Sequence, residues 1–206
     1  MIIDSEFFVK SAKKRAEVAI ELAKWGWYPT PCAPVNVKLW QLTANNQVNE
    51  FHVERGKKYL LQNMEYCLDN APMRSCVLKA GFRLHESGEF YGSIPIFLAQ
   101  AEGVFNEVFK RSIFNNKHRS YENISQTQNL EEGSFFDAFL ASTYVKNQIG
   151  ADKSQCSEKL KVKGPNRNGI MHGDANHVDY GSEINSLKAF SLLCCAVWLS
   201  KLDAET

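Results

Sequence analysis

The spacing of apolar residues constrains this chain more than any other feature of its sequence. Intervals of three and four residues place side chains on one face of an α-helix, whereas strict alternation indicates a strand. Over residues 93–111 such intervals form one broad apolar stripe, made of Ile94, Phe97, Leu98, Ala101, Val104, Phe105, Val108 and Phe109. A stripe of this width is typical of a helix that faces a core. The chain is therefore expected to fold around amphipathic helices.

The same spacing predicts further helices and few strands. Helices are expected over residues 5–25, 48–68, 74–85, 135–149 and 183–202. Ser182 is placed to cap the last of these, and Pro165 to lie in the first turn of a short helix that ends at His172, with Gly173 just past it. Residues 115–133 are typical of a loop, and residues 159–163 alternate as a short strand or extended arm would. The predicted fold class is all-α.

Composition excludes several classes of protein. With 206 residues, 44% of them hydrophobic, the chain is long enough to bury a sizeable core. The net charge of +1 implies no general attraction to nucleic acid or membranes, although a local basic patch is compatible with it. The uncharged stretch over residues 189–200 is too short to span a bilayer, and charges at Asp4, Glu6 and Lys10 interrupt the apolar run that a signal peptide needs. No membrane association and a cytoplasmic location are expected.

The cysteines show no pattern of a metal or redox site. None of the six forms a CxxC pair, and their spacing is irregular. Two neighbours lie in an apolar run, where free thiols behave as small hydrophobic groups. Reduced core cysteines in the cytoplasm are therefore expected at Cys32, Cys67, Cys76, Cys156, Cys194 and Cys195.

Polar side chains that can carry chemistry are concentrated between two predicted helices. Within thirteen positions the chain places Arg167, Asn168, His172, Asp174, His177 and Asp179. If this stretch is helical, Asn168 and His172 share a face, and the long Arg167 side chain can reach a phosphate next to the imidazole. Histidine suits proton transfer near neutral pH. An Arg–His pair that acts on a phosphodiester without a metal is thus one interpretation of this segment.

Two other interpretations compete with it. A metal site built from His172, Asp174, His177 and Asp179 has suitable donor atoms, but it lacks a ligand pair at i,i+4 on a helix and any second cluster. Solvated loop residues explain those four side chains better, and no metal or other cofactor is expected. A nucleophilic triad needs a Ser or Cys on a sharp turn, and the chain has no GxSxG motif.

The spacing Arg167-Asn168-x-x-x-His172 resembles the signature of the HEPN superfamily, whose name abbreviates higher eukaryotes and prokaryotes nucleotide-binding. The resemblance is wider than this motif. LHESGEFYGSIPIFLAQAEGVF, residues 84–105, is similar to the preceding core helices of bacterial members. NRNGIMHG and the following DYGSEINSLKAFSLL are similar to the end of the catalytic helix, the turn and the closing helix of that family. The likeness covers residues 54–202.

The first fifty residues resemble nothing in that family. We therefore predict two parts, an N-terminal helical extension over residues 1–50 and a HEPN-like helical domain over residues 51–206. In the extension, Trp25, Trp27 and Tyr28 lie beside prolines. Stacking on RNA bases is one role for such rings. We expect them instead to anchor the extension in the core or at an interface.

The resemblance implies a helical bundle of the HEPN type that forms a homodimer through the face bearing the motif. Many members of the family are metal-independent endoribonucleases that serve as toxins or anti-phage defence effectors. Carried over to this chain, Arg167 and His172 are catalytic, Asn168 is the accompanying polar residue, and Glu102 is a supporting acid on an earlier helix. The apolar pattern alone favours Glu102 as a boundary residue that reaches water. RNA is the implied substrate, and an antitoxin or regulatory protein a further partner.

Basic residues offer a separate indication of RNA binding. Two groups could steer a phosphate backbone, Lys110, Arg111, Lys117 and Arg119 in one, and Lys161 and Lys163 in the other. A solvated surface explains them as well. The competing function is a non-catalytic helical dimer that binds RNA, a nucleotide or a protein, in which Arg167 forms a salt bridge and His172 a hydrogen bond at a helix end.

Overall fold

A computed structural model describes residues 17–33, 47–110, 112–114, 142–143, 147–152 and 164–202. Its helices are residues 17–24, α2 (Gln47–Lys58), α3 (Leu60–Asn70), η2 (Pro72–Arg74), α4 (Ser75–Glu86), α5 (Phe90–Phe109), α9 (Arg167–Met171), η5 (Ala175–His177) and α10 (Glu183–Leu202). These segments hold one isolated β-bridge, between Thr30 and Ala33, and no strand. The all-α prediction is confirmed. The elements predicted over 115–133, 135–149 and 159–163 lie wholly or mostly outside the described residues.

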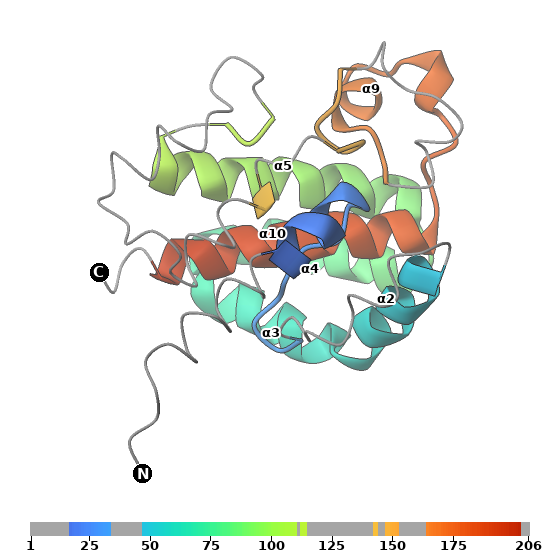
Figure 1. Cartoon of the computed structure of the whole chain (residues 1–206). Coiled ribbons are helices and arrows are strands. Elements are labelled where there is room, and N and C mark those ends of the chain that lie inside the picture. The colour runs from blue at the N-terminus through green and yellow to red at the C-terminus, as the bar shows by residue number, and fades with distance from the viewer. Residues whose placement is uncertain are drawn as a thin grey trace.

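Helices α5 and α10 form the centre of the molecule and run parallel (Figure 1). The Ser93 and Ser186 hydroxyl oxygens are 2.7 Å apart, and four residues later on both helices the rings of Phe97 and Phe190 are 5.4 Å apart. Helix α10 is buried over residues 186–197, on all of its faces. A helix that is apolar all round belongs in the middle of a bundle. Helix α9 lies in the connection between these two parallel helices.

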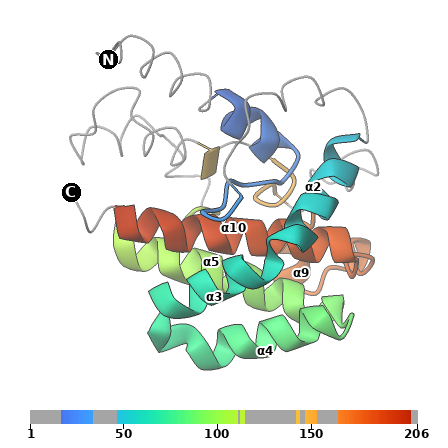
Figure 2. The same cartoon turned by 90° about the horizontal axis from the view of Figure 1, so that it is seen from below.

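Helix α4 packs against α5 as an antiparallel hairpin (Figure 2). The two helices approach closely at Gly81, where an added Cβ would lie 2.8 Å from the Phe97 ring. Where α4, α5 and α10 meet, the buried His85 ring nitrogen lies 2.8 Å from the Ser186 hydroxyl, which also contacts Ser93. Burial lowers the pKa of His85. This hydrogen-bonded group fixes how the three helices are aligned.

The sequence predicts one helix over residues 48–68, and that prediction is wrong, because the structure has two helices with a break at Tyr59 (φ −108°, ψ 13°). The bend lets each half reach a different part of α10. Val48, in α2, packs with Leu187, whereas Cys67, in α3, packs in the main core. The predictions for α4 and α10 are confirmed. Helix α5 begins three residues earlier than predicted and ends at Phe109.

The N-terminal segment covers α10 on the side away from α4 (Figure 2). Trp27 and Tyr28 are buried, as expected for anchoring residues. Trp27 packs with Val48 and Leu187, and the Tyr28 backbone N–H donates to the Ser191 hydroxyl over 3.2 Å. The predicted boundary at residue 50 falls inside α2, and the division into two parts stays a prediction.

Two titratable groups are buried beneath this segment. The Lys188 ammonium nitrogen lies 5.5 Å from the centre of the Trp27 ring, and burial lowers the pKa of Lys188 to about 7. The His52 ring stacks on the same Trp27 ring, and the two ring centres are 5.2 Å apart. Burial, aided by the charges of Arg55 and Lys188, lowers the pKa of His52 to about 4. The contact between the N-terminal segment and the bundle is therefore sensitive to pH.

The cysteine and membrane predictions have mixed outcomes. Cys67, Cys194 and Cys195 are buried free thiols, but Cys76 is exposed and Cys32 partly exposed, so the core prediction is wrong for Cys76. Cys76 lies on the solvent side of the first turn of α4, and Cys156 lies outside the described residues. Over the described residues, every helix is too short or too polar to cross a membrane.

Candidate functional site

Helix α9 is short, and local hydrogen bonds define both of its ends. The buried Asn166 side chain caps the start by accepting a hydrogen bond from the Gly169 N–H over 2.7 Å. At the other end the N–H groups of Gly173 and Asp174 donate to the carbonyls of Ile170 and Gly169 over 3.1 and 2.9 Å. This is a Schellman motif, and Gly173 adopts the left-handed φ of +62° that it requires. The sequence located Gly173 correctly but placed the helix start at Pro165, two residues early.

Tertiary contacts hold α9 in place. The Asn166 amide donates to the carbonyls of Gln148 and Ala151 over 3.0 and 3.1 Å. On the inner face, a Cβ added at Gly169 would lie only 2.2 Å from the buried His177 ring. Glycine is required there because the histidine ring occupies the position of a side chain. His177 thus packs beneath α9, away from the exposed His172.

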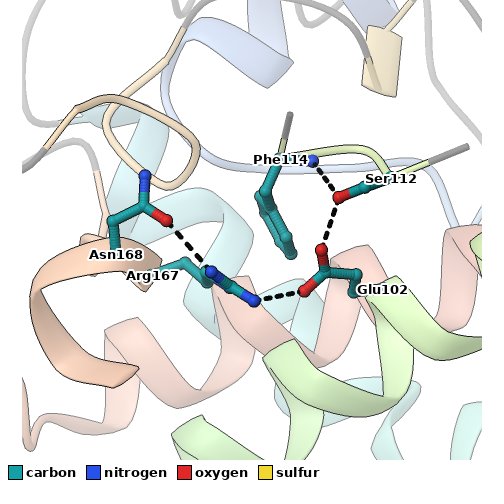
Figure 3. A network of polar contacts seen from close by, with 5 residues as sticks. All are labelled: Glu102, Ser112, Phe114, Arg167 and Asn168. Atoms are coloured by element: carbon teal, nitrogen blue, oxygen red, sulfur yellow. Dashed lines mark hydrogen bonds and ion pairs between the residues drawn. The ribbon is translucent and has the colours of Figure 1, made fainter. Parts of the chain in front are cut away.

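The Arg167 guanidinium points to α5 and binds Glu102 (Figure 3). Arg167 Nη2 donates to Glu102 Oε2 over 2.5 Å, and both side chains are 23% exposed. Arg167 Nη1 donates to Asn168 Oδ1 over 3.1 Å, and the Asn168 amide donates to the Ala151 carbonyl. The structure therefore brings together Arg167, Asn168 and Glu102, three of the four residues that the sequence singles out as catalytic or supporting.

The segment that follows α5 closes the other side of this group. The Ser112 hydroxyl donates to Glu102 Oε1 and accepts the Phe114 backbone N–H over 3.1 Å. The Phe114 ring lies 5.3 Å from the guanidinium carbon of Arg167, within the range of a cation–π contact. Sequence reasoning missed Ser112 and Phe114, because they lie more than fifty residues from Arg167 and form no motif with it.

The two predicted catalytic side chains have different surroundings. A guanidinium carries five N–H donors, and among the described residues Arg167 uses one on each Nη, which leaves one on each Nη and the buried Nε–H. His172 is the C-cap of α9 and is exposed, as is Met171 beside it. Its backbone N–H bonds to the Asn168 carbonyl over 3.2 Å. Within the described part of the chain, no hydrogen bond joins the side chains of Arg167 and His172.

The residues on either side of Glu102 in α5 also bind Arg74 and so attach η2 to α5. Arg74 donates to Gln100 Oε1 and to Glu107 Oε1, each over 2.5 Å, and its guanidinium lies directly over Gly103, 2.9 Å from the place of a Cβ. Gln100 and Gly103 therefore hold η2 against α5. In the stretch QAEG, residues 100–103, Glu102 is the residue that binds Arg167, while Gln100 and Gly103 contact Arg74.

Pro95 explains how the chain after α9 is attached to the bundle. Proline has no N–H, so the Tyr91 carbonyl one turn earlier lacks its helical partner. The Tyr180 hydroxyl donates to that carbonyl over 3.0 Å, and the rings of Tyr91 and Tyr180 pack edge to face at 5.1 Å. This contact ties the segment that follows η5 to the start of α5.

The remaining predicted site residues are only partly described. Lys110 is exposed at the left-handed C-cap of α5 (φ 53°), and its ammonium donates to the Glu107 carbonyl over 2.7 Å. The other predicted RNA-binding residues, Arg111, Lys117, Arg119, Lys161 and Lys163, lie outside the described residues. Across the segments that the structure describes, no three His, Cys, Asp or Glu side chains converge as metal ligands would.

Comparisons of the chain with protein-family models, with curated proteins and with solved structures find no match. Membership of the HEPN superfamily therefore stays a prediction that depends on the motif residues.

Proposed function

We propose that this protein is a cytoplasmic, metal-independent endoribonuclease of the HEPN type, a toxin or anti-phage defence effector. RNA is its substrate, it requires no cofactor, and an antitoxin or regulatory protein controls it. The observation that supports the proposal most is the arrangement of α9. One end holds a guanidinium in a fixed position with donors left over, and the other presents an exposed imidazole.

The reaction needs two proton transfers. One histidine removes the proton from the ribose 2′-OH, the 2′-oxygen attacks the adjacent phosphorus, and the P–O5′ bond breaks as a second histidine donates a proton to the leaving oxygen. One imidazole can make only one of these transfers at a time. We therefore propose that a homodimer joins His172 and the partner subunit's His172 in one cleft. The products carry 2′,3′-cyclic phosphate and 5′-OH ends.

Arg167 stabilises the charge that develops on the phosphorane. A fixed donor is worth more than a flexible one, because it needs no reorganisation when the charge appears. Glu102, Asn168 and Phe114 restrict the guanidinium before RNA binds, and the remaining Nη hydrogens are available to phosphate oxygens. Glu102 and Asn168 are thus positioning residues that act through Arg167.

One observation favours the competing function. A half-buried Arg167–Glu102 ion pair is the arrangement expected if Arg167 only stabilises the fold of a non-catalytic dimer that binds RNA, a nucleotide or a protein. That function also predicts a hydrogen bond from the His172 side chain at the helix end. In the structure the hydrogen bonds of His172 to α9 come from its backbone N–H, and its side chain is exposed.

Incubation of the purified protein with a mixed RNA pool in EDTA tests the proposal. Analysis of the product ends should show 2′,3′-cyclic phosphate and 5′-OH groups. Products with 5′-phosphate ends contradict the mechanism. Intact RNA, at protein concentrations where the dimer is confirmed by light scattering, favours the non-catalytic dimer.

A further inference from the structure

A cavity of about 50 Å³ lies beneath the N-terminal segment and shares no described residue with the Arg167 site. Its described walls come from residues 22–33, from α2 and α3 between residues 52 and 63, and from α10 between residues 187 and 191. A water molecule takes up about 30 Å³ in the liquid, so the cavity has room for a small ligand of a few non-hydrogen atoms. A ligand held there would contact both the N-terminal segment and the bundle.

One amide in the wall of this cavity has unused hydrogen-bond donors. Asn63 is only 4% exposed, and its Oδ1 accepts the Cys32 backbone N–H over 3.3 Å and the Cys194 thiol over 3.6 Å. Because a backbone N–H can only donate, the amide oxygen must face Cys32 and the amide nitrogen must face away from it. Within the described residues, Asn63 Nδ2 donates no hydrogen bond. A buried amide without a partner is costly, so this one indicates an acceptor in the cavity.

Two further side chains in the wall can donate to the same ligand. Thr30 is 8% exposed, and its hydroxyl makes no hydrogen bond in the part of the chain that the structure describes. The His52 ring is held by stacking on Trp27, and among the described residues its nitrogens have no hydrogen-bond partner either. A neutral imidazole has one N–H donor. Asn63, Thr30 and His52 thus present donors, which favours a ligand with acceptor oxygens.

The surroundings of the cavity favour an anion that also has an apolar part. The positive charges of Arg55 and Lys188 lie close enough to His52 to help lower its pKa. A negative charge beside His52 would interact favourably with both of them. Much of the remaining described wall is apolar or aromatic, including Leu22 and Phe190. A carboxylate with a short hydrocarbon end matches both features, whereas inorganic phosphate has nothing to pack on the apolar wall.

We propose that this cavity binds a short-chain carboxylate such as propionate. The carboxylate oxygens accept hydrogen bonds from Asn63 and Thr30, and the hydrocarbon end packs on the apolar wall. The ligand joins Thr30 of the N-terminal segment to Asn63 of α3 and so stabilises the contact between the segment and the bundle. This site is separate from the Arg167 site, and the proposal does not depend on RNA cleavage.

Ligand-observed NMR titration of the full chain tests the proposal, because it detects the weak binding expected of so small a ligand. Propionate should bind about ten-fold more tightly than propionamide, which has nearly the same shape and no charge. Inorganic phosphate should bind no better than propionamide. The temperature of unfolding should rise more with propionate than with the same concentration of propionamide. Equal binding of propionate and propionamide, or no binding of propionate at millimolar concentrations, would overturn the proposal.

Two variants test the assigned donors. Thr30→Val removes the hydroxyl and nearly keeps the shape, and it should weaken propionate binding about ten-fold. Asn63→Asp keeps an oxygen for the Cys32 N–H and puts a repelling charge in the wall, so binding should be lost. Asn70→Asp makes the same change in α3 outside the cavity, where the Asn70 amide donates to the Tyr66 carbonyl over 2.9 Å, and should leave binding unchanged.

Circular dichroism shows which variants are folded. If Asn63→Asp does not fold, Thr30→Val decides alone. Parent affinity for propionate in folded Thr30→Val would overturn the proposal.

Discussion

The two ends of α9 lie only five residues apart and differ in how the fold holds them. At the first end, Arg167 contacts α5, the segment after α5 and its neighbour Asn168. At the second, the His172 backbone N–H bonds to the Asn168 carbonyl while the side chain faces solvent. Substitution of Arg167 should therefore affect folding and chemistry together, whereas substitution of His172 should affect chemistry alone. The following predictions test this contrast, from the largest expected effect to the smallest.

Arg167→Ala should have the largest combined effect. Removal of a fixed donor that stabilises developing charge lowers reaction rates by about 10²–10³-fold. It also leaves the half-buried Glu102 carboxylate without its cation, which costs roughly 2 kcal/mol of unfolding free energy. Cleavage assays and urea unfolding measure the two losses. Arg74→Ala removes another arginine that pairs with a carboxylate of α5, Glu107, outside the site. It should lower stability and leave the cleavage rate of the folded protein unchanged.

Acid should destabilise the contact between the N-terminal segment and the bundle. His52 has an ordinary pKa of 6.5 that the fold lowers to about 4. Between these values the unfolded chain binds a proton that the folded chain does not, so the contribution of His52 to stability is full above pH 6.5 and is lost as the pH drops towards 4. The difference amounts to about 3 kcal/mol. Urea unfolding at several pH values measures it, and His52→Gln should reduce the slope. An unchanged slope in that variant would place the acid sensitivity elsewhere.

Gly169→Ala tests how tightly the middle of α9 is packed. The added methyl group would overlap the His177 ring, which is fixed in the interior, and such overpacking costs about 1–3 kcal/mol. Gly56→Ala is the matched control in α2. There the new Cβ meets only Leu187, at 3.4 Å, and alanine favours helix by up to ~1 kcal/mol. Thermal unfolding should therefore shift in opposite directions for the two variants.

Ser112→Ala should have the smallest effect. It removes one hydrogen bond to Glu102 but leaves the Arg167–Glu102 pair in place. We expect a loss of about 1 kcal/mol in stability and a modest decrease in cleavage, with Ser112→Thr closer to the parent. An equal loss of activity in Ser112→Ala and Arg167→Ala would show that the segment after α5 has a larger role than positioning.

Local patterns in the sequence predicted the helices and the end of α9 well. The apolar spacing of α5 and α10 reports the core directly, and Ser182 and Gly173 act through hydrogen bonds within a few residues. The break at Tyr59 escaped prediction because it depends on where α10 lies. The cap at Asn166 escaped it because that side chain also bonds to Gln148 and Ala151, whose position depends on the fold.

The site was only partly predictable, because some of its contacts also depend on tertiary packing. The spacing of Arg167 and His172 placed both on one short helix, and the pattern on α5 marked Glu102 as unusual. Helical spacing does not report that Arg167 turns towards α5, because its partners Glu102, Ser112 and Phe114 meet it through tertiary packing. His172 was correctly placed at the helix end, and its exposure follows from the shortness of α9.

The central claim is tested most directly by measuring RNA cleavage in EDTA and thermal unfolding on the same preparations of parent, His172→Ala and Arg167→Ala. We predict that His172→Ala unfolds at the temperature of the parent and cleaves about 10²–10⁴-fold more slowly, whereas Arg167→Ala is impaired in both measurements. Equal cleavage by all three proteins would contradict the account, because the activity would then belong to another site.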